Sequence, residues 1–543
     1  MTNIIFPRKE LEKHIRINEE ILEKISLLGT PLERADKNEI EIEVFPNRPD
    51  LISLQGFLRA FKSFLGEEKG LKEYIINKPE KNYKVYVKKE VNDLRPYTVC
   101  AILKNLNLDN EKIKDIINLQ EKLHLTIGRN RKKVAIGIYP LEKIKLPIIY
   151  TAKNPEDIKF QPLEFPRELN GKQILLKHPA GKKYAYLLEK QKKYPVFIDA
   201  NDKILSMPPI INSEETGKIT EQTKEVFVEC SGSDLNVLNK TLNIIVTVFA
   251  DMGCSIYQMQ IKGNKKIITP DLSPDKIKIS LENVNKLLGL KLSDSELSEF
   301  LSRMGYNYKN SVVEIPAWRT DILHEVDIIE DVAIAYGYNN FEPEIPEIST
   351  IGKESEESKA RRKISEISTG LQALEISTYH LIKQEEADSL KVAKPLELVD
   401  SKTEYKILRP NLLIPTLRIL SENVDTEYPQ KIFEIGTIFQ KDLDSETGIK
   451  EQENLIMAIT PANFTQIKQH LDYLMKSLNI DYNIEESSHP QLIDGRSGAV
   501  VITKNKKIGH IGEVHPLTLK KLGLKMPLAV FEISLEEIYK LIT

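Results

Sequence analysis

Two segments rich in charge and proline divide this chain into parts that must fold around separate cores. They are INKPEKNYK at 76–84 and EPEIPEISTIGKESEESK at 342–359. Proline fixes φ and has no N–H to donate, so such runs end helices and strands rather than continue them. The 543 residues also exceed what one core can hold. At roughly 150 residues per domain, we expect about three to five domains.

The composition is that of a soluble globular protein, with 41% hydrophobic and 29% charged residues. No apolar run approaches the roughly 18 residues of a membrane span. The opening MTNIIFPRKELEKH becomes charged at once and lacks an apolar signal core. Three scattered cysteines without a CxxC pair argue against a disulfide framework and against a zinc ribbon. We therefore expect a cytoplasmic protein with no membrane partner.

The charge of the chain does not decide whether it binds nucleic acid. The net charge of −3 does not point to a nucleic-acid binder. Locally, residues 172–193 hold seven lysines and one glutamate, and residues 129–133 form a second basic cluster. Such patches neutralise phosphates, but a lysine face in solvent explains them equally well.

The run RTDILHEVDIIEDVAIAYGY at 319–338 concentrates four acids, Asp321, Asp327, Glu330 and Asp331. A helix beginning near His324 places the last three on one stripe, because spacings of three and four share a face. Asp321 precedes that helix and is expected to reach the same place from a loop. The opposite, buried face is expected to hold Val326, Ile329, Val332, Ala333 and Tyr336.

Acids at these spacings repel one another, so a cation is expected to offset them. Mg²⁺ suits the site, because it takes oxygen ligands and is usually held by one or two carboxylates and several waters. The residues also allow two readings without a metal. The acids can form an ordinary face in solvent, or an arginine can supply the counter-charge, for which Arg319 is the candidate.

The wider stretch VEIPAWRTDILHEVDIIEDVAIAYGYNNF at 313–341 resembles the B5 domain of the phenylalanyl-tRNA synthetase β subunit. This resemblance implies that the four acids bind Mg²⁺ at the border with the α subunit. Two short helices are expected before it, at 280–290 and 292–306, the second with a capping box from Ser293 to Glu296. They predict a small helix-turn-helix-like unit.

The N-terminal region carries a second, shorter resemblance. EIEIEVF at 39–45 alternates with period two, which predicts a strand with one buried face. NRPD at 47–50 then precedes a helical run, and Asp50 is expected to cap its first turn. The motif also resembles the NRPDLLS signature of the B1 region in the same β subunit.

Three segments predict a mixed α/β module with a cleft in the region that follows. Residues 119–139 read as helix, basic turn and strand, and residues 227–253 as strand, turn and long apolar helix. Between them, ILSMPPIINSEETGKI at 204–219 has paired prolines, which suit a cleft wall better than a central strand. All three resemble the B3/B4 editing module in its archaeal and eukaryotic form. This resemblance implies hydrolysis of tyrosine wrongly attached to tRNA(Phe).

An editing site has a physical purpose, because an apolar pocket rejects a substrate that merely adds a hydroxyl by only about a hundredfold. A second site must hydrogen-bond the phenol. The polar candidates are Asn212, Ser213, Glu214 and Asp234, and the candidate walls are Leu205, Met207, Pro208 and Pro209. Each polar residue can equally be an ordinary turn or capping residue.

The C-terminal third alternates strands and helices and resembles the B6/B7 region, a class II synthetase-like antiparallel sheet without its chemistry. A working class II site needs arginines for the ATP phosphates, the later one in a GxGxGxER-like stretch. IGHIGEVHPLTLKKLGL stands in that place. Arg409 and Arg418 are therefore expected to be structural or interfacial, and the segments LRPNLLIPTLR and FEIG to be candidates for contact with an α subunit.

The expected fold class is α+β multidomain. Its expected parts are a B1-like domain (1–76), a B3/B4-like editing module (84–265), a helix-turn-helix-like B5 domain (266–342) and a degenerate class II synthetase-like antiparallel sheet with helices, resembling B6/B7 (360–543). No inserted OB-fold and no C-terminal anticodon domain is evident, as in the shorter archaeal and eukaryotic β subunit.

The resemblance implies a subunit of an α₂β₂ complex that joins phenylalanine to tRNA(Phe) with ATP, the aminoacylation site lying on α. The sequence has no HExxH, GxSxG or P-loop motif that would give this chain another catalytic site. Two rival functions stay open. One is a freestanding hydrolase that edits mischarged tRNA in trans, and the other is a tRNA-binding or assembly protein that has lost editing.

Overall fold

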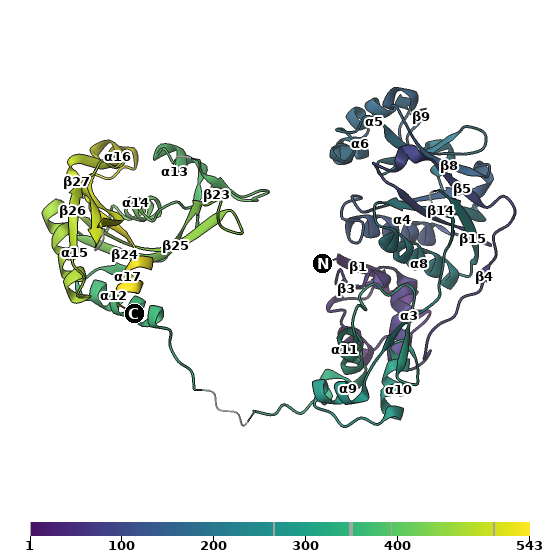
Figure 1. Ribbon diagram of the computed structural model, residues 1–543. Helices are drawn as coiled ribbons and strands as arrows, with labels where there is room; N and C mark the ends of the chain where they lie inside the picture. The colour runs from purple at the N-terminus through teal and green to yellow at the C-terminus, as the bar shows by residue number, and fades with distance from the viewer. Residues whose placement is uncertain (1, 264–265, 347–350, 393, 503–504, 543) are drawn as a thin grey trace. The chain divides into compact units, whose positions relative to one another are not determined.

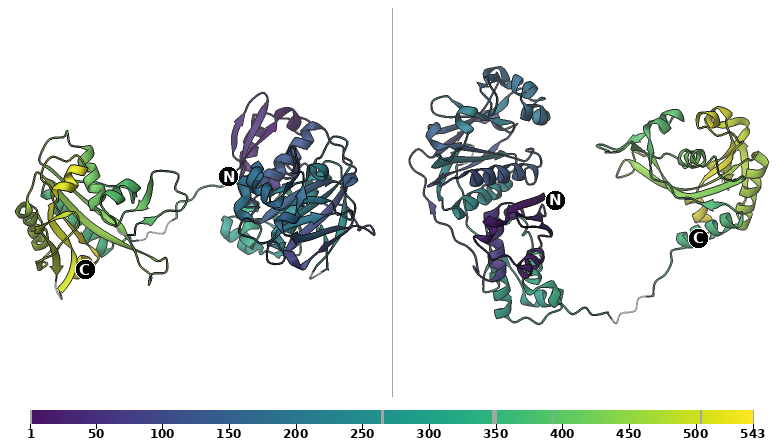
Figure 2. Two further views of the ribbon diagram at one scale, coloured as in Figure 1. Left: turned by 90° about the horizontal axis from the view of Figure 1, so that it is seen from above. Right: turned by 180° about the vertical axis from the view of Figure 1, so that it is seen from behind.

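The computed structural model describes residues 2–263, 266–346, 351–392, 394–502 and 505–542. The chain forms two compact units, Met1–Ile345 and Pro346–Thr543. They are drawn together in Figure 1 and from two other sides in Figure 2. The division falls inside the expected linker at 342–359. No helix among the described residues is both long and apolar enough to cross a bilayer.

The first unit opens with a small antiparallel sheet in the order β1-β3-β2. In its central strand Ile40, Ile42 and Val44 are buried and alternate with glutamates, as the period-two pattern predicts. Its strands and helices are β1 (Thr2–Pro7), α1 (Arg8–Glu12), α2 (Glu19–Leu27), β2 (Leu32–Ala35), β3 (Glu39–Val44) and α3 (Leu54–Leu65).

The prediction that Asp50 caps α3 is wrong. The chain first makes a 3₁₀ turn at Pro49–Leu51, and Ser53 caps the helix by accepting the N–H of Gly56 at 3.1 Å. The turn lies so close to α3 that a Cβ at Gly56 would fall 1.9 Å from the carbonyl oxygen of Asp50. Only glycine allows this approach, and Asp50 is left to pair with Arg48.

A mixed sheet of eleven described strands follows, along the path β13-β12-β11-β8-β5-β15-β6-β14-β7, with β16 and β4 beside β15. The strands are β4 (Ile76–Asn77), β5 (Lys84–Val87), β6 (Tyr97–Lys104), β7 (Val134–Pro140), β8 (Ile148–Lys153), β11 (Tyr194–Ile198), β12 (Ile204–Met207), β13 (Ile211–Asn212), β14 (Glu225–Gly232), β15 (Ser255–Lys262) and β16 (Lys266–Thr269).

Helices α4 (Asn110–Leu125) and α8 (Leu235–Asp251) lie on one face of this sheet (Figures 1 and 2). They bury the apolar residues of β6, β7 and β14 that point to that side. Residues of the same strands that point the other way, such as Tyr139 and Phe227, belong to a different core. Smaller elements complete the region: β9 (Lys159–Phe160), β10 (Leu169–Asn170), α5 (Gly171–Lys177), α6 (Pro179–Tyr184) and α7 (Glu214–Gly217).

Residues 275–336 form three helices around a three-stranded sheet in the order β17-β19-β18. The capping box from Ser293 to Glu296 is present as predicted, and Gly305 follows the helix end with φ +80°. The elements are β17 (Asp275–Lys278), α9 (Leu281–Leu288), α10 (Asp294–Arg303), β18 (Asn307–Lys309), β19 (Val312–Ile315) and α11 (Glu325–Tyr336).

One hydrophobic core runs through all of the first unit's parts except the outer region of the large sheet. It includes Phe61 of α3, Val246 of α8, Val313 of β19 and Val332 of α11. The contact comes about because α3 packs against both α8 and α10. Residues 1–76 and 266–342 therefore share a core with part of the module between them.

The second unit is built on a seven-stranded sheet in the order β20-β24-β25-β29-β28-β27-β26, antiparallel except for β20. A three-stranded sheet, β21-β23-β22, stands beside it. The strands are β20 (Leu374–Glu375), β21 (Leu381–Lys383), β22 (Leu396–Glu397), β23 (Tyr405–Leu408), β24 (Gln430–Lys441), β25 (Ile449–Thr460), β26 (Tyr482–Glu486), β27 (Leu492–Ile502), β28 (Lys506–Val514) and β29 (Ala529–Ser534).

Helices of the second unit are α12 (Glu356–Gly370), α13 (Gln384–Ser389), α14 (Leu413–Glu422), α15 (Phe464–Ser477), α16 (Pro516–Lys521) and α17 (Glu536–Ile542). Arg409 is 1% exposed and pairs with Glu434, and Arg418 pairs with Glu386, so both arginines are structural. The segments LRPNLLIPTLR and FEIG are also largely interior, since Leu413 and Phe433 are buried. They do not offer the contact surface predicted for them.

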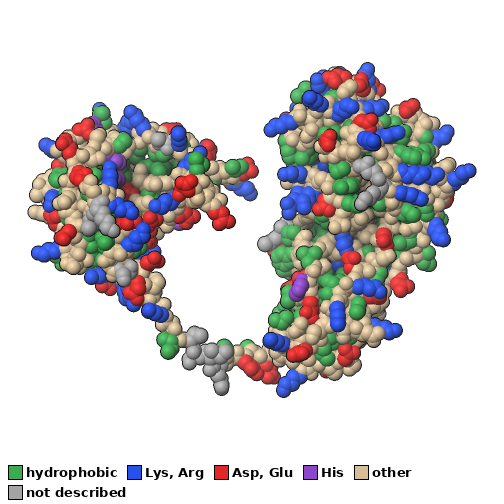
Figure 3. All heavy atoms as spheres, viewed as in Figure 1, with side chains coloured by type: hydrophobic (Ala, Val, Ile, Leu, Met, Phe, Trp, Pro, Cys, Tyr) green, Lys and Arg blue, Asp and Glu red, His purple; other side chains and the backbone are tan. Residues whose placement is uncertain are grey.

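Lys and Arg side chains on the visible face of both units are interspersed with Asp and Glu (Figure 3). This mixed surface agrees with the small net charge.

Candidate functional site

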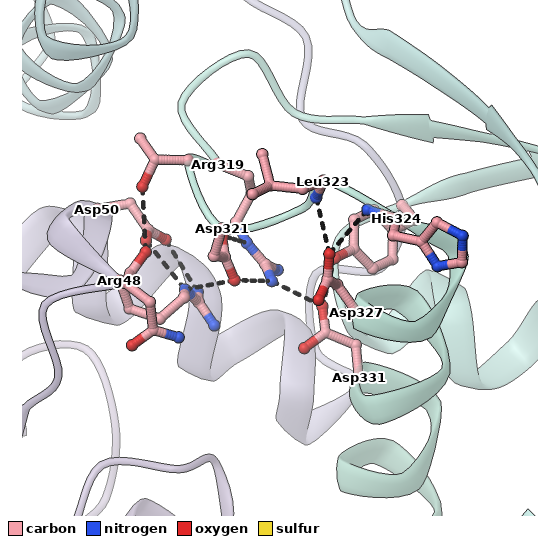
Figure 4. A network of polar contacts seen from close by, with 11 residues as sticks. Arg48, Asp50, Arg319, Asp321, Leu323, His324, Asp327 and Asp331 are labelled. Carbon is pink, nitrogen blue, oxygen red and sulfur yellow. Dashed lines mark hydrogen bonds and ion pairs between the residues drawn. The ribbon is translucent and has the colours of Figure 1, made fainter. Parts of the chain in front are cut away.

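The two motifs that the sequence singles out lie side by side in the first unit. Arg48 of NRPD donates from Nε and Nη2 to the two carboxylate oxygens of Asp50, at 2.9 Å each. Its Nε also lies 4.0 Å from Oδ2 of Asp321 in the acidic segment. Thr320 Oγ1 donates to the carbonyl of Asn47 at 3.0 Å. The N-terminal turn is thus tied to the loop before α11 (Figure 4).

Arg319 lies at the centre of this cluster and is 3% exposed at its side chain. It donates to both oxygens of Asp321 at 2.8 and 2.7 Å, and from Nη2 to Oδ2 of Asp331 at 2.8 Å. The hydroxyl of Tyr306 donates to the same Asp331 oxygen. Burial opposes the charge on Arg319, but its ion pairs with Asp331 and Asp321 outweigh burial and raise its pKa well above the usual range. Arg319 is therefore the counter-charge to two of the four acids, a role for which the sequence made it the candidate.

The other two acids, Asp327 and Glu330, have roles that differ from those of Asp321 and Asp331. Asp327 accepts the backbone N–H groups of Leu323 and His324 at 2.8 Å each and so closes the first turn of α11. Glu330 is exposed on the same helix. Within the described residues, no group of three or more His, Cys, Asp or Glu side chains is placed to hold a metal ion. In this structure of the single chain the four acids do not fit a magnesium site, and the metal stays a prediction.

The predicted faces of α11 need one correction on each side. Val326, expected to be buried, is 51% exposed, and Asp331, expected on the acidic face, is 4% exposed. Val326 stands in the first turn, before the helix reaches the core. Asp331 is drawn inward because Arg319 and Tyr306 satisfy it there.

A second site is a cavity of about 430 Å³ in the large sheet module. It is walled by the segment after β12, by the end of α4 and by the start of β7. Apolar side chains supply much of the wall, namely Ala135, Ile136, Pro208, Pro209, Ile210 and Ile211. A largely apolar cavity of this size with a few polar groups is typical of small-ligand sites.

Glu229, in the middle of β14, forms the polar floor of this cavity and is 2% exposed. Burial raises its pKa to about 8 although Arg95 and the hydroxyl of Tyr139 oppose the shift. Oε1 accepts the Tyr139 hydroxyl at 3.3 Å, whereas Oε2 is buried and has no hydrogen-bond partner among the described residues. Glu229 is thus mainly a neutral acid at pH 7, and one of its buried oxygens has no hydrogen-bond partner among the described residues.

The hydroxyl of Tyr139 connects the floor to the wall. It donates to Ser206 Oγ at 2.8 Å and lies 3.4 Å from Oδ1 of Asn212. One hydroxyl proton serves only one acceptor at a time, so Ser206, Asn212 and Glu229 compete for the proton of Tyr139. The cavity floor is therefore a network that can both donate to and accept from a hydroxyl group.

Glu121, His124 and Arg131 form one rim of the cavity. His124 accepts the backbone N–H of Ile136 on Nε2 at 2.8 Å and faces Glu121 with Nδ1 at 3.3 Å, so its proton is on Nδ1. Burial lowers the pKa of His124 to about 4, and the bonds from His124 and Arg131 lower the pKa of Glu121 to about 2. Arg131 also donates to the carbonyl of Ile210 at 2.7 Å, which fixes the opposite wall.

The residues that the sequence predicted for a cleft are distributed around this cavity. Asn212, Pro208 and Pro209 line it. The others are outside the described lining. Leu205 and Met207 are fully buried in neighbouring cores, and Ser213 donates its N–H to the Leu205 carbonyl. Glu214 accepts the N–H of Glu164, and Asp234 caps α8.

Sequence reasoning missed Glu229, Tyr139 and His124, and it included Arg131 only in the basic cluster at 129–133. A signal for Glu229 was present, since it is a single acid in the apolar strand VFVECSG. Such a residue must be paired or neutralised when buried. The rim residues carry no comparable signal. His124 and Arg131 meet only because residues 129–131 all adopt positive φ values and turn the chain back sharply.

Comparisons with known proteins agree with one another. The family model described as tRNA synthetase B5 domain matches residues 277–338, and that of the phenylalanyl tRNA synthetase beta chain CLM domain matches residues 342–535. The phenylalanine–tRNA ligase β subunit of Thermococcus kodakarensis is 39% identical over 520 residues, covering 91% of this chain and 90% of that protein. The β subunit of Archaeoglobus fulgidus is 37% identical and covers 98% of this chain and 97% of that protein.

A solved structure also matches more than half of this chain. An N-terminal fragment of the phenylalanyl-tRNA synthetase β subunit of Pyrococcus horikoshii covers 62% of this chain and 99% of that fragment, with a TM-score of 0.59 and 38% identity. These matches define a protein built from tRNA synthetase domains. The chain belongs to the phenylalanine–tRNA ligase β subunit family.

Replacing Arg319 with methionine is expected to lower the free energy of unfolding of the first unit by about 3 to 5 kcal/mol, since it leaves two buried carboxylates without their cation. Chemical denaturation followed by circular dichroism measures the loss. The double variant Arg319→Met/Asp331→Asn is expected to recover part of it. A single variant as stable as the wild type would show that the ion pairs contribute nothing.

The raised pKa of Glu229 makes the stability of the first unit depend on pH. The unfolded chain releases this proton near pH 4.5 and the folded chain near pH 8. Stability linked to Glu229 is therefore fully present below pH 4.5 and falls as pH rises to 8, by up to about 1.4 kcal/mol per pH unit. Denaturation of wild type and Glu229→Gln across pH 5 to 8 tests this, and we expect a flatter profile for the variant. Parallel profiles would contradict the assignment.

Proposed function

We propose that this chain is the β subunit of an α₂β₂ phenylalanyl-tRNA synthetase. In this proposal the complex uses ATP to join phenylalanine to tRNA(Phe), and the site of this reaction lies on the α subunit. The β chain hydrolyses tyrosine that is wrongly attached to tRNA(Phe). Residues 1–76 would be B1-like, 84–265 the B3/B4-like editing module, 266–342 the B5-like domain and 360–543 the non-catalytic B6/B7-like domain. Family membership and the cavity around Glu229 support the proposal.

The observation that carries the editing proposal is the unpartnered buried oxygen of Glu229. A phenylalanine ring placed on this floor leaves that oxygen unsatisfied, which is costly in an apolar cavity. The phenol of tyrosine supplies a hydroxyl that bonds to Glu229. A site built to hydrogen-bond a hydroxyl rejects a ligand that lacks this hydroxyl by about 10⁴-fold or more. Apolar contact alone discriminates by only about a hundredfold.

The chemistry is ester hydrolysis and needs no protein nucleophile in this cavity. Ser206 accepts a hydrogen bond from Tyr139, and both ring nitrogens of His124 face partners, so neither forms a serine–histidine pair. We propose that a bound water attacks the aminoacyl carbonyl carbon with help from the neighbouring ribose hydroxyl. The ester bond to the ribose oxygen then breaks, and that oxygen takes up the proton lost by the water, which releases free tyrosine and tRNA(Phe). The protein would contribute by fixing the amino acid between the apolar walls and the floor.

The contact surface for the α subunit is proposed to lie on the exposed apolar side chains of the second unit. Leu374 is 68% exposed, Tyr379 75%, Val399 90% and Leu443 83%. Apolar side chains favour association with another protein where they form a contiguous exposed patch, and these four are the candidates for such a patch. This proposal replaces the LRPNLLIPTLR and FEIG segments, which are largely interior.

Deacylation of Tyr-tRNA(Phe) by the chain copurified with its α partner tests the editing proposal. Glu229→Gln keeps the volume of the side chain but fixes an amide in place of the acid, and we expect it to slow deacylation by about 10²-fold or more while leaving aminoacylation intact. Asp234→Ala is the matched control. It removes a helix cap that lies outside the described lining, so it is expected to cost about 1 kcal/mol of stability and leave deacylation unchanged.

The remaining outcomes distinguish the rival functions. Deacylation by the chain alone at the rate of the complex would favour a freestanding editing hydrolase. No hydrolysis by the intact wild-type complex would leave an assembly and tRNA-binding subunit without editing. If Asp234→Ala abolished hydrolysis and Glu229→Gln did not, the cavity would be the wrong site.

The magnesium prediction becomes a proposal for the assembled complex. Arg319 already offsets Asp321 and Asp331 in the single chain. We propose that Glu330, which is exposed on α11, and Asp327, three residues before it on the same helix, take up Mg²⁺ only when a partner subunit supplies the remaining ligands. Affinity would then depend on assembly.

Calorimetric titration with MgCl₂ checks this dependence. We expect no saturable binding to the chain alone, and no loss of stability on adding EDTA, because the buried acids have an arginine partner. The copurified complex is expected to bind Mg²⁺, and Glu330→Gln is expected to weaken that binding about tenfold, unlike Glu282→Gln, which changes an exposed acid on α9. Tight binding by the isolated chain would contradict the proposal.

A further inference from the structure

We infer that Arg95 is a positioning residue for the cavity around Glu229, because its buried side chain joins the rim of the cavity to the strand that carries the floor. This inference rests on the proposed editing function. Arg95 lies between the 3₁₀ turn Lys89–Val91 and β6 and is 7% exposed. It is not part of the described lining of the cavity. Its effect on a bound amino acid is therefore passed on through other residues.

The guanidinium of Arg95 makes three hydrogen bonds, all to backbone carbonyls. Nη1 donates to the carbonyls of Arg131 and Lys132 at 3.2 Å each, and Nη2 donates to the carbonyl of Ser231 at 2.5 Å. The backbone of Arg95 is held as well, since its carbonyl accepts the hydroxyl of Tyr150 at 2.9 Å. One side chain, fixed against the sheet, thus binds two segments that are about 100 residues apart in the sequence.

The rim needs such support because of its backbone conformation. Arg129, Asn130 and Arg131 have φ values of 47°, 54° and 65°. Residues other than glycine are strained in this left-handed region and persist there only where the surrounding structure holds them. Arg95 holds the last of the three at its carbonyl. The side chain of Arg131 then donates to the carbonyl of Ile210 at 2.7 Å, so the position of the opposite wall also depends on this turn.

The contact of Arg95 with the floor is made close to Glu229. Ser231 lies two residues after Glu229 on β14, so both side chains point to the same face of the sheet. By binding the carbonyl of Ser231, Arg95 fixes the end of the strand on which the floor stands. The distance between the rim at Arg131 and the floor at Glu229 therefore depends on one guanidinium.

Arg95 also acts on Glu229 through its charge. Burial raises the pKa of Glu229 to about 8, and the positive charge of Arg95 is the largest influence in the opposite direction. The other titratable groups beside Glu229 are Tyr139, Tyr150, Cys100 and Cys230. Burial raises the pKa of each of these four groups, so all of them are neutral at pH 7.

The titratable side chains that line the cavity do not replace this charge. They are Glu121, His124, Arg131, Glu164 and Lys218. Arg131 pairs with Glu121, and Lys218 pairs with Glu214. Arg95 has no ion-pair partner among the described residues, so its charge is the one that acts on the proton of Glu229. Position and charge can therefore be tested separately.

Arg95→Lys tests the positioning. It keeps the charge, but its single nitrogen cannot hold rim and floor together as the two guanidinium nitrogens do. For the chain copurified with its α partner, we expect kcat for deacylation of Tyr-tRNA(Phe) to fall by about tenfold or more, because a reacting group is misplaced. KM is expected to stay within about twofold, since most of a tRNA binds outside the cavity.

Arg95→Met tests the charge. The pH profile of kcat/KM, after subtraction of uncatalysed hydrolysis, is expected to change near pH 8 in the wild type, where Glu229 titrates. We expect this change at higher pH in Arg95→Met, because removing a nearby cation disfavours the ionised acid. Arg95→Lys is expected to keep it near pH 8. A residue that only stabilised the fold would not separate the two variants in this way.

Hydrogen exchange of the full chain, measured by mass spectrometry, tests the positioning without the reaction. We expect the amides of 129–133 and 210–213 to exchange about tenfold faster or more in Arg95→Lys. Arg59→Lys is the matched control. Arg59 is 8% exposed and donates to Tyr74 and Asp251, outside the described lining of the cavity. Exchange in the two segments and kcat should be unchanged in this variant.

The outcomes separate this inference from the editing proposal. No hydrolysis by the wild-type complex would contradict editing. Faster exchange in Arg95→Lys would then still support Arg95 as the residue that positions the cavity, and unchanged exchange would overturn it. With an active wild type, three results would overturn the inference: unchanged kcat in Arg95→Lys, an equal loss of kcat in Arg59→Lys, or the same pH profile in Arg95→Met as in the wild type.

Discussion

Burial of the Arg319 guanidinium is the constraint on which the arrangement of the first unit depends. Removing such a charge from water is costly unless its hydrogen bonds and ion pairs are complete. Here Asp321 lies in the same loop and Asp331 on α11, so the arginine fixes the loop against the helix. Arg48 extends the chain of charges to the NRPD turn. Segments far apart in the sequence are thereby held in one place, next to the core that they share.

The cost of burying a charge also decides the state of Glu229 in the cavity of the large sheet, but this acid loses its charge instead of pairing with a cation. Among the described residues Glu229 has no ion-pair partner to keep it ionised, and burial raises its pKa to about 8. Arg95 is near but is turned to the carbonyls of Arg131, Lys132 and Ser231. The acid is therefore neutral at pH 7 and able to donate as well as accept. The buried Asp331 belongs to a charged cluster, whereas the buried Glu229 supplies a polar group in an apolar cavity, because their nearest partners differ.

The local sequence pattern predicted helices and strands well, but it did not predict which residues contact one another. Alternation in EIEIEVF predicted β3, and the capping box at Ser293 predicted the start of α10. The placing of Asp50 as a helix cap was wrong because a 3₁₀ turn packs against Gly56, and no local propensity shows that contact. Asp331 belonged to an acidic stripe by spacing but is buried by Arg319, twelve residues earlier. Asn212 was found by its position after paired prolines, whereas Glu229 required knowing which strand lies behind them.

The interior of the second unit holds a network of buried charges that are satisfied by one another. Arg409 donates to Glu434 at 2.8 Å and to Thr378 at 2.7 Å, and the Thr378 hydroxyl donates in turn to Glu434 at 2.7 Å. Glu532 accepts two backbone N–H groups and the side chain of Asn454. Gly436 lets this cluster close, since a Cβ there would fall 2.5 Å from Arg409. These charges are satisfied by one another, so a nucleotide phosphate would have to displace them.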